Sequence, residues 1–133
     1  MNAILEAVIT PLLDVFTEAV LLTDHTGTLV FANAAARARF EIDRYQGMPL
    51  DKRLAEMPIF LLDGTPLPAS EDPVVQALAR RAPAGGARVI VEGHGERRWY
   101  VMNTAPVFDG DRLAGTASVF HEAGISCGTT PLR

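Results

Sequence analysis

The chain has 133 residues, of which 48% are hydrophobic, and 12 basic and 16 acidic side chains leave a formal net charge of −4. This length and composition fit one soluble globular domain whose core needs no metal or disulfide for stability. The charges are dispersed and form no basic stripe, which argues against a protein that binds nucleic acid. Cys127 is the only cysteine, so a disulfide framework and a metal cluster of sulfur ligands are excluded, and we expect a reducing, cytoplasmic setting.

The first 18 residues predict an amphipathic helix, because apolar side chains recur at helical spacing at Leu5, Val8, Ile9, Leu12 and Phe16. Pro11 either begins a second helix after Thr10 or kinks a continuous one. The segment carries three acidic residues, no basic leader and no uninterrupted run of about 18 apolar residues, which argues against a signal peptide or a membrane helix.

Two short strands are predicted next, at residues 19–24 and 28–32, with Gly27 in the turn between them. Asn33 follows the second strand and precedes an alanine-rich run at 34–40 that is typical of a helix. An asparagine here can accept hydrogen bonds from the first free helical amides, and such a cap contributes about 1 kcal/mol. We therefore interpret Asn33 as an architectural residue.

The segment 41–71 is rich in glycine and proline and predicts loops with short helical pieces. A longer helix is expected over 71–81, with Asp72 as the N-cap and Pro73 at its first position. Its apolar face consists of Val74, Val75 and Leu78.

Three strands are predicted in the last third of the chain, at residues 87–93, 97–108 and 113–122. A two-residue turn at His94-Gly95 and a five-residue loop are both compatible with the first connection, and they pair the strands differently. Under the longer loop, Glu92 faces Arg98 in a surface ion pair. Large apolar side chains alternate onto both faces of the middle strand, so both faces need a cover. The internal helices can cover one face, and the N-terminal helix or a partner subunit the other.

Three phrases of the chain, "EAVLLTDHTGTLVFANAAA", "DGTPLPASEDPVVQALA" and "RRWYVMNTAPVFDGDRLAGTASVFHE", resemble the Per-Arnt-Sim (PAS) family of sensory domains in their order and spacing. The resemblance covers residues 19–122 and matches the family's helix-capping asparagine to Asn33, and its hairpin proline and glycine to Pro106 and Gly115. One departure concerns the end of the last strand, where many members have Asp-Ile-Thr. Here the acidic residue is retained as Glu122, but the threonine is absent, which leaves signal transmission through this junction open.

The resemblance implies an α+β fold: a five-stranded antiparallel sheet with short helices on one face and the N-terminal helix on the other. The expected organisation is a helix at 1–18 for dimerisation or cover, a PAS-like core at 19–122, and a tail or linker at 123–133. By analogy with the family's strand faces, the expected ligand pocket consists of Val74, Val75, Leu78, Arg88, Ile90, Tyr100, Met102, Thr104, Thr116, Ser118 and Phe120. These residues could instead pack on one another as a core, and Arg88 either anchors a carboxylate in the pocket or reaches solvent.

The resemblance implies that flavin and haem are possible cofactors, and the sequence shows whether the residues that usually attach them are present. A flavin photoadduct needs a cysteine after the helix that follows the asparagine, and "NAAARARFEIDRYQG" contains none. A haem sensor usually supplies a histidine from the long helix, and "DPVVQALARRAPAGG" contains none, whereas His25, His94 and His121 fall in a turn, a loop and a strand end. Non-covalent flavin or a metabolite remains possible as the ligand, and no metal site is expected. The absence of hydrolase, metalloprotease and phosphate-loop motifs argues against an enzyme.

The resemblance thus implies a cytoplasmic sensory domain of a signal-transduction protein that binds a small molecule between the helical lid and the sheet. The effector, such as a kinase, a cyclase or a transcription factor, is not part of this chain, and neither nucleic acid nor membrane is an expected partner. The alternative is a ligand-free module for dimerisation or protein interaction. In either case we expect a homodimer whose interface consists of Leu5, Val8, Ile9, Leu12, Phe16, Trp99, Val101 and Val119.

Overall fold

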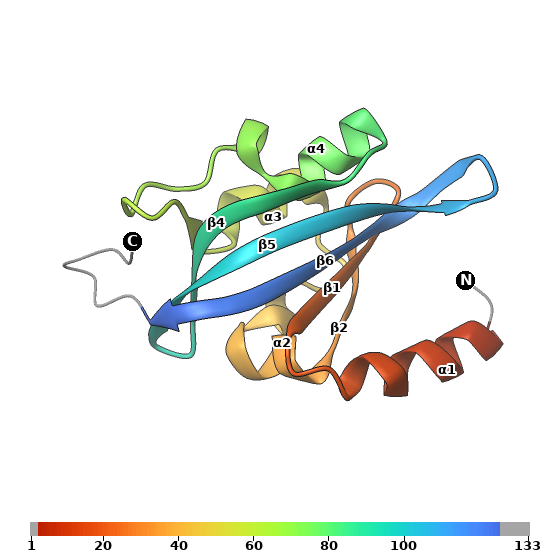
Figure 1. Cartoon of the computed structure of the whole chain (residues 1–133), viewed down its shortest axis with the longest axis horizontal. Helices are drawn as coiled ribbons and strands as arrows, with labels where there is room; N and C mark the ends of the chain where they lie inside the picture. The colour runs from red at the N-terminus through yellow and green to blue at the C-terminus, as the bar shows by residue number, and fades with distance from the viewer. Residues whose placement is uncertain (1–2, 126–133) are drawn as a thin grey trace.

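A curled antiparallel sheet of six strands, in the spatial order β2-β1-β6-β5-β4-β3, organises the chain (Figure 1). The computed structural model describes residues 3–125, and the side chains of residues 9–124. The elements in chain order are α1 (Ala3–Asp14), β1 (Ala19–Asp24), β2 (Leu29–Ala32), α2 (Ala34–Arg39), the 3-10 helix η1 (Ile42–Tyr45), α3 (Leu50–Glu56), β3 (Ile59–Phe60), the 3-10 helix η2 (Ala69–Glu71), α4 (Pro73–Arg80), β4 (Ala84–Gly93), β5 (Glu96–Asp109) and β6 (Arg112–Ile125). The predicted α+β class is confirmed, and β3 adds a short edge strand to the five that were predicted.

The helix boundaries follow from local hydrogen bonding. The side chain of Asn33 accepts from the amide of Ala36 at the start of α2, and Asp72 accepts from the amide of Val74 at the start of α4. Pro73 occupies the first turn of α4, where its missing amide costs nothing. These two caps are confirmed, and α1 runs continuously through Pro11, which decides between the two alternatives at that residue.

The turn between β4 and β5 is the two-residue one. His94 and Gly95 both have positive φ, 52° and 79°, as a type I′ hairpin turn requires. The strands therefore pair with Glu92 opposite Arg97, and the Nε of Arg97 lies 2.9 Å from the Oε2 of Glu92. The surface ion pair forms with Arg97, and the Glu92–Arg98 pairing expected from a longer loop is wrong.

This register also decides which face of the sheet each β4 side chain occupies. Ile90 pairs with Trp99 and Arg88 pairs with Val101, so all four side chains lie on the outer face, away from α3 and α4. The expected inward placement of Arg88 and Ile90 is therefore wrong. The two-residue turn shifts the strand pairing by one residue relative to the longer loop. A shift of one residue moves each β4 side chain to the opposite face of the sheet.

The inner face of the sheet carries a closely packed core. The rings of Phe40, Tyr100 and Phe120 meet edge to face, with centroids 5.1 to 6.0 Å apart. Further along the sheet, β1 and β6 approach closely at Gly115, where a Cβ would overlap the carbonyl oxygen of Thr23. The glycine that matched the family's hairpin position is thus required by β1–β6 packing.

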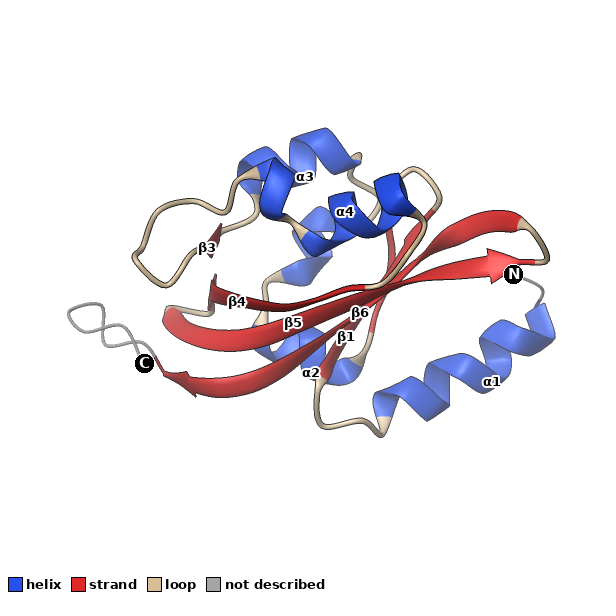
Figure 2. Cartoon of the chain, turned by 45° about the horizontal axis from the view of Figure 1, so that its top comes forward, coloured by secondary structure: helices blue, strands red, loops and turns tan. Residues whose placement is uncertain are grey.

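The other side of the sheet is more open. In both views the sheet lies between α1 and the pair α3 and α4 (Figures 1 and 2). Asp14 attaches the end of α1 to α2, because its carboxylate accepts a hydrogen bond from the amide of Ala34 at 2.8 Å. Leu12, Val15 and Phe16 nevertheless remain 54%, 73% and 45% exposed, so a row of apolar side chains beside the sheet has no cover within the described chain.

Candidate functional site

Six of the predicted pocket residues come together on the inner face of β5 and β6. They are Tyr100, Met102, Thr104, Thr116, Ser118 and Phe120, and each is at most 3% exposed. From α4, Val74 is buried in the same core, Leu78 packs against its margin and Val75 is half-buried. Of the eleven predicted residues, the structure thus places eight in or against this core, leaves Val75 half-buried on α4, and places Arg88 and Ile90 on the other face of the sheet.

These residues fill the interior by contacting one another. The hydroxyls of Thr104 and Ser118 are 2.7 Å apart, and those of Thr23 and Thr116 are also 2.7 Å apart. Each buried hydroxyl therefore has a partner across two neighbouring strands. Burial raises the pKa of Tyr100 to about 12, so its phenol stays protonated at neutral pH. Binding of a ligand among these side chains stays a prediction.

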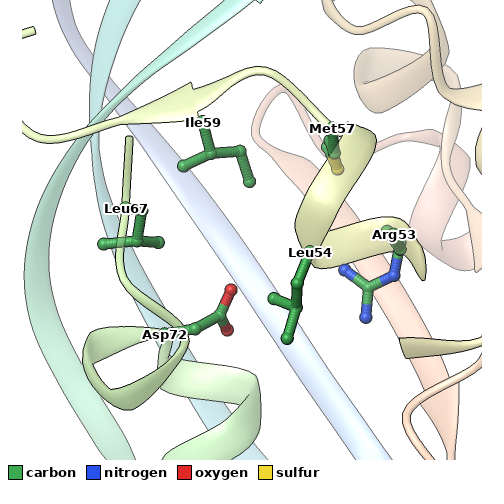
Figure 3. A pocket seen from close by; sticks show the side chains of 6 residues that line it. All are labelled: Arg53, Leu54, Met57, Ile59, Leu67 and Asp72. Atoms are coloured by element: carbon green, nitrogen blue, oxygen red, sulfur yellow. The ribbon is translucent and has the colours of Figure 1, made fainter. Parts of the chain in front are cut away.

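A small cavity lies beside this core, between the sheet and the helices (Figure 3). Its volume is about 10 Å³, and its lining comes from α3, β3, the segment before η2 and the start of α4. The residues are Arg53, Leu54, Met57, Ile59, Leu67 and Asp72. A volume of this order accommodates about one water molecule.

Two oppositely charged side chains face this cavity from opposite sides, with Leu54 between them (Figure 3). Arg53 is 3% exposed and Asp72 is 2% exposed. The Nη2 of Arg53 donates to the carbonyl oxygen of Gly27 at 2.8 Å, whereas its Nε is buried without a hydrogen-bond partner among the described residues. Asp72 accepts from the amide of Val74 at 2.8 Å through Oδ1. The guanidinium thus has one buried donor without a partner among the described residues.

Burial acts on both charges. It raises the pKa of Asp72 and lowers the pKa of Arg53, and the charge of each partner partly offsets the effect on the other. No direct ion pair joins the two within the described chain; they interact across the cavity. The site therefore has no net charge when both groups are ionised.

Arg53 is the functional candidate that the sequence interpretation missed. It lies in the segment 41–71, where only short helical pieces were expected. One signal was available: Arg53 follows Leu50 by three residues and precedes Met57 by four, so it occupies the apolar face of α3. An arginine on the apolar face of a helix indicates a buried charge.

The predicted dimer interface lies on the outer side of the sheet and on α1. Trp99, Val101 and Val119 are half-buried on the outer face, as expected. The indole Nε1 of Trp99 is buried without a hydrogen-bond partner among the described residues. From α1 and its end, Ile9 is half-buried, and Leu12 and Phe16 are exposed. Leu5 and Val8 lie outside the residues whose side chains the structure describes.

Two further properties concern residues 3–125 alone. No helix in this range is long and apolar enough to cross a membrane. The same residues contain no cluster of three or more histidine, cysteine, aspartate or glutamate side chains suited to a metal ion. Cys127 lies outside the described residues.

The sequence and the fold of this chain are similar to those of known proteins. A sequence model described as "PAS fold" matches residues 13–123, and a search of the curated proteins found no match. The chain is similar in structure to the PAS domain of Bordetella pertussis BvgS, with a TM-score of 0.58 and 18% identity over 90% of this chain and 85% of that one. It is also similar to the PAS domain of nitrogen regulation protein NR(II) from Vibrio parahaemolyticus, with a TM-score of 0.59 and 14% identity over 86% and 97%. A variant of RsLOV has a TM-score of 0.68 and 18% identity over 97% and 72%.

Proposed function

The chain belongs to the PAS-fold family, and from this premise we propose that it is the sensory module of a signal-transduction protein. In this proposal a small molecule binds between the helical lid and the sheet and changes the position of α3 and α4. The observation that carries the proposal is the buried pair Arg53 and Asp72 beside a cavity. Burying two charges without a direct ion pair costs several kcal/mol, and a domain used only for packing gains nothing from that cost.

The size of the interior restricts the ligand. The space on the inner face is filled by the rings of Phe40, Tyr100 and Phe120, and the cavity at Arg53 has a volume of about 10 Å³. A flavin ring would have to displace more of this packed interior than a small metabolite does, and a light-oxygen-voltage receptor is among the structural neighbours. The proposed ligand is therefore a small metabolite, and the effector that receives the signal is a kinase, cyclase or transcription factor in the same cytoplasmic pathway.

The proposal predicts that a screen of small metabolites by thermal unfolding contains compounds that raise the melting temperature. A ligand present at 100 times its Kd stabilises the native state by about 2.7 kcal/mol, which corresponds to several degrees for a domain of this size. Native mass spectrometry of the same mixtures should show the mass of one ligand per chain. A broad screen with no melting shift and no added mass would contradict the proposal.

A second function, pairing of subunits, is supported by the exposed apolar row at the end of α1. Leu12 in the helix and Val15 and Phe16 directly after it are exposed beside an apolar sheet face, and a second copy related by two-fold symmetry can bury both surfaces. The structural neighbours include the complex of DhaR(N) with DhaL from E. coli.

The pairing hypothesis predicts that the double substitution Leu12→Glu and Phe16→Glu converts a homodimer into monomers. Two buried glutamates in an apolar interface would repel and remain unpaired, which costs far more than an isolated surface change. Light scattering after size-exclusion chromatography gives the mass directly. Val30→Glu is the matched control, because Val30 is 49% exposed on the β2 edge. A double variant that remains dimeric contradicts this interface.

A further inference from the structure

Most of the exposed large apolar side chains of the domain lie on one side of the sheet. Six such side chains are at least 43% exposed among the described residues. Three of them, Leu12, Val15 and Phe16, lie at the end of α1, and a fourth, Val107, lies on β5 near its hairpin with β6. Gathered apolar patches mark interaction sites, whereas single apolar residues do not. A cover for these four side chains has to come from outside the described chain.

Val107 continues the outer face of β5, the face turned away from α3 and α4. Tyr100 and Met102 are buried on the inner face, so the odd-numbered residues of this strand point to the outer one. The outer face carries an apolar strip, which consists of Val101, Ala105 and Val107 of β5 and Ala117 and Val119 of β6. Ala105 and Ala117 are direct partners across the two strands. Their small side chains leave room for a helix to approach the sheet.

The end of α1 is held in an orientation that keeps its apolar side chains off the sheet of its own chain. The Nδ2 of Asn33 donates to the carbonyl oxygen of Leu13 at 2.9 Å, and the carboxylate of Asp14 accepts from the amide of Ala34 at 2.8 Å. These bonds fix the last turn of α1 at the start of α2 while Leu12 remains exposed. In both views α1 lies on the side of the sheet opposite α3 and α4 (Figures 1 and 2). The helix end and the apolar strip thus share a side without covering each other.

The charges of the two surfaces are opposite. Residues 3–18 contain three acidic side chains and no basic one. Arg88 is exposed on the outer face of β4, directly opposite Val101 of the apolar strip. It forms no ion pair with any side chain of residues 9–124. An acidic helix placed along the strip would bring carboxylates toward this guanidinium.

We propose that the apolar strip receives α1 of a second copy of this chain, and that the contact is reciprocal. Each copy places its α1 on the sheet of the other, and Arg88 attracts the acidic helix. The inference rests on the proposed pairing of subunits and assigns the two surfaces that meet. A stable interface buries about 800 Å² on each partner. A two-fold axis makes the helix-on-sheet contact twice, so each copy contributes both of its apolar surfaces to that area.

Two complementary variants of the whole chain test this contact. One carries Leu12→Glu and Phe16→Glu on the helix, and the other carries Val101→Arg and Val107→Arg on the strip. In a dimer of either variant alone both reciprocal contacts are damaged, so the dimer dissociation constant is expected to rise by at least about 100-fold. In an equimolar mixture one contact is native, and the other brings glutamates against arginines. The mixture is therefore expected to form heterodimers with a constant within about tenfold of the wild-type value. Analytical ultracentrifugation measures the constants, and native mass spectrometry identifies the heterodimer.

Phe108→Arg is the matched control for the strip. Phe108 is 43% exposed and Val107 is 44% exposed, and both lie near the tip of the same hairpin. Phe108 points to the other face, where the guanidinium carbon of Arg81 lies 5.3 Å from the centre of its ring. This variant is expected to dimerise as the wild type does. A loss equal to that of the strip variant would mean that the hairpin tip as a whole, and not its outer face, forms the contact, which overturns the proposal.

The role of Arg88 has a separate test at an exposed position, where a substitution leaves the fold intact. Arg88→Glu is expected to raise the dimer dissociation constant about tenfold at low salt, and about twofold or less near 1 M salt, because salt screens exposed charges. Arg80→Glu, at the exposed end of α4 on the other side of the sheet, is the control and leaves the constant unchanged. An effect of Arg88→Glu that is the same at both salt concentrations overturns the attraction.

The outcomes separate this inference from the function on which it rests. If the strip variant dimerises as tightly as the wild type, α1 pairs with another surface, so the inference fails and the pairing of subunits stands. If the helix and strip variants are folded but remain monomeric on mixing, the reciprocal contact fails. If the doubly substituted strip variant does not fold, Val107→Arg, at an exposed position, replaces it in the mixture. If the wild-type protein is a monomer, both the pairing function and this inference fail.

Discussion

Replacing Arg53 by methionine is expected to lower the free energy of unfolding by about 3–5 kcal/mol near neutral pH. The substitution retains much of the side-chain volume but leaves the carboxylate of Asp72 buried with no compensating charge, and breaking a buried pair on one side costs about this much. The hydrogen bond from Nη2 to the carbonyl of Gly27 is also lost.

The effect of this substitution should depend on pH in one direction. Burial already raises the pKa of Asp72 above its usual 3.8, and the charge of Arg53 counteracts part of that rise. Without Arg53 the pKa of Asp72 in the folded state rises further. The folded state then binds more protons than the unfolded state, so stability falls as the pH rises from about 4 through the folded pKa. Below pH 4, Asp72 is protonated in both states and the difference from wild type is smallest.

Urea unfolding at pH 4, 5, 6 and 7 measures this dependence. Lys52→Met is the matched control, because Lys52 is the preceding residue on α3, its side chain is 61% exposed, and its Nζ lies 4.0 Å from the Oε2 of Glu56. Its expected effect is under about 0.5 kcal/mol at every pH. A loss in Arg53→Met that is the same at pH 4 and pH 7 would mean that Asp72 does not respond to Arg53.

Replacing Asn33 by aspartate is expected to cost about 2–6 kcal/mol although the two side chains have the same shape. Asn33 is fully buried and makes four hydrogen bonds. Its Oδ1 accepts from the amides of Val20 and Ala36, at 2.9 and 3.0 Å. Its Nδ2 donates to the carbonyl oxygens of Leu13 and Glu18, both at 2.9 Å.

Aspartate preserves the two bonds that Oδ1 accepts and removes the two that Nδ2 donates. The second carboxylate oxygen then faces two carbonyl oxygens, and each unsatisfied buried group costs about 1–3 kcal/mol. The lost bonds are the ones that tie the end of α1 to the body of the domain, so the expected result is release of α1 before global unfolding. Faster amide hydrogen exchange in α1, with β5 and β6 still protected, measures this release.

Asn103→Asp is the control for this experiment. Asn103 is exposed on β5, and its Oδ1 accepts from the amide of Gly86 at 2.9 Å, a bond that aspartate retains. We expect a change within about 0.5 kcal/mol. If Asn33→Asp leaves exchange in α1 unchanged, the attachment of this helix rests on the contacts of Asp14 alone.

Asn33 also shows which contacts the sequence predicts and which it does not. Its position between a strand and an alanine-rich run predicts a cap, and the cap is present because it depends only on residues three positions apart. The two bonds to the α1–β1 connection join residues 15 and 20 positions apart. No local pattern predicts them, because they depend on how the chain returns past its own N-terminal segment.

The face of β4 that carries Arg88 was decided by a turn of two residues. Periodicity predicts that β4 alternates, but both loop lengths were compatible with the sequence, and they differ by one residue in register. In the structure His94 has a positive φ, which forms the two-residue turn. Histidine does not require a positive φ, so the residue type alone does not predict this turn. Alternation alone therefore could not assign Arg88 to the inside or the outside.

By itself the sequence determined the order of the longer helices and of five of the six strands, the two caps at Asn33 and Asp72, and the α+β class with its family resemblance. These features depend on hydrogen bonds and apolar spacing within a few residues. Only the tertiary structure decided that most of the expected pocket residues fill a core, and that Arg53 of α3 and Asp72, the N-cap of α4, line one cavity. Nineteen positions separate these two charges in the chain, and their proximity arises from packing of both helices on one sheet.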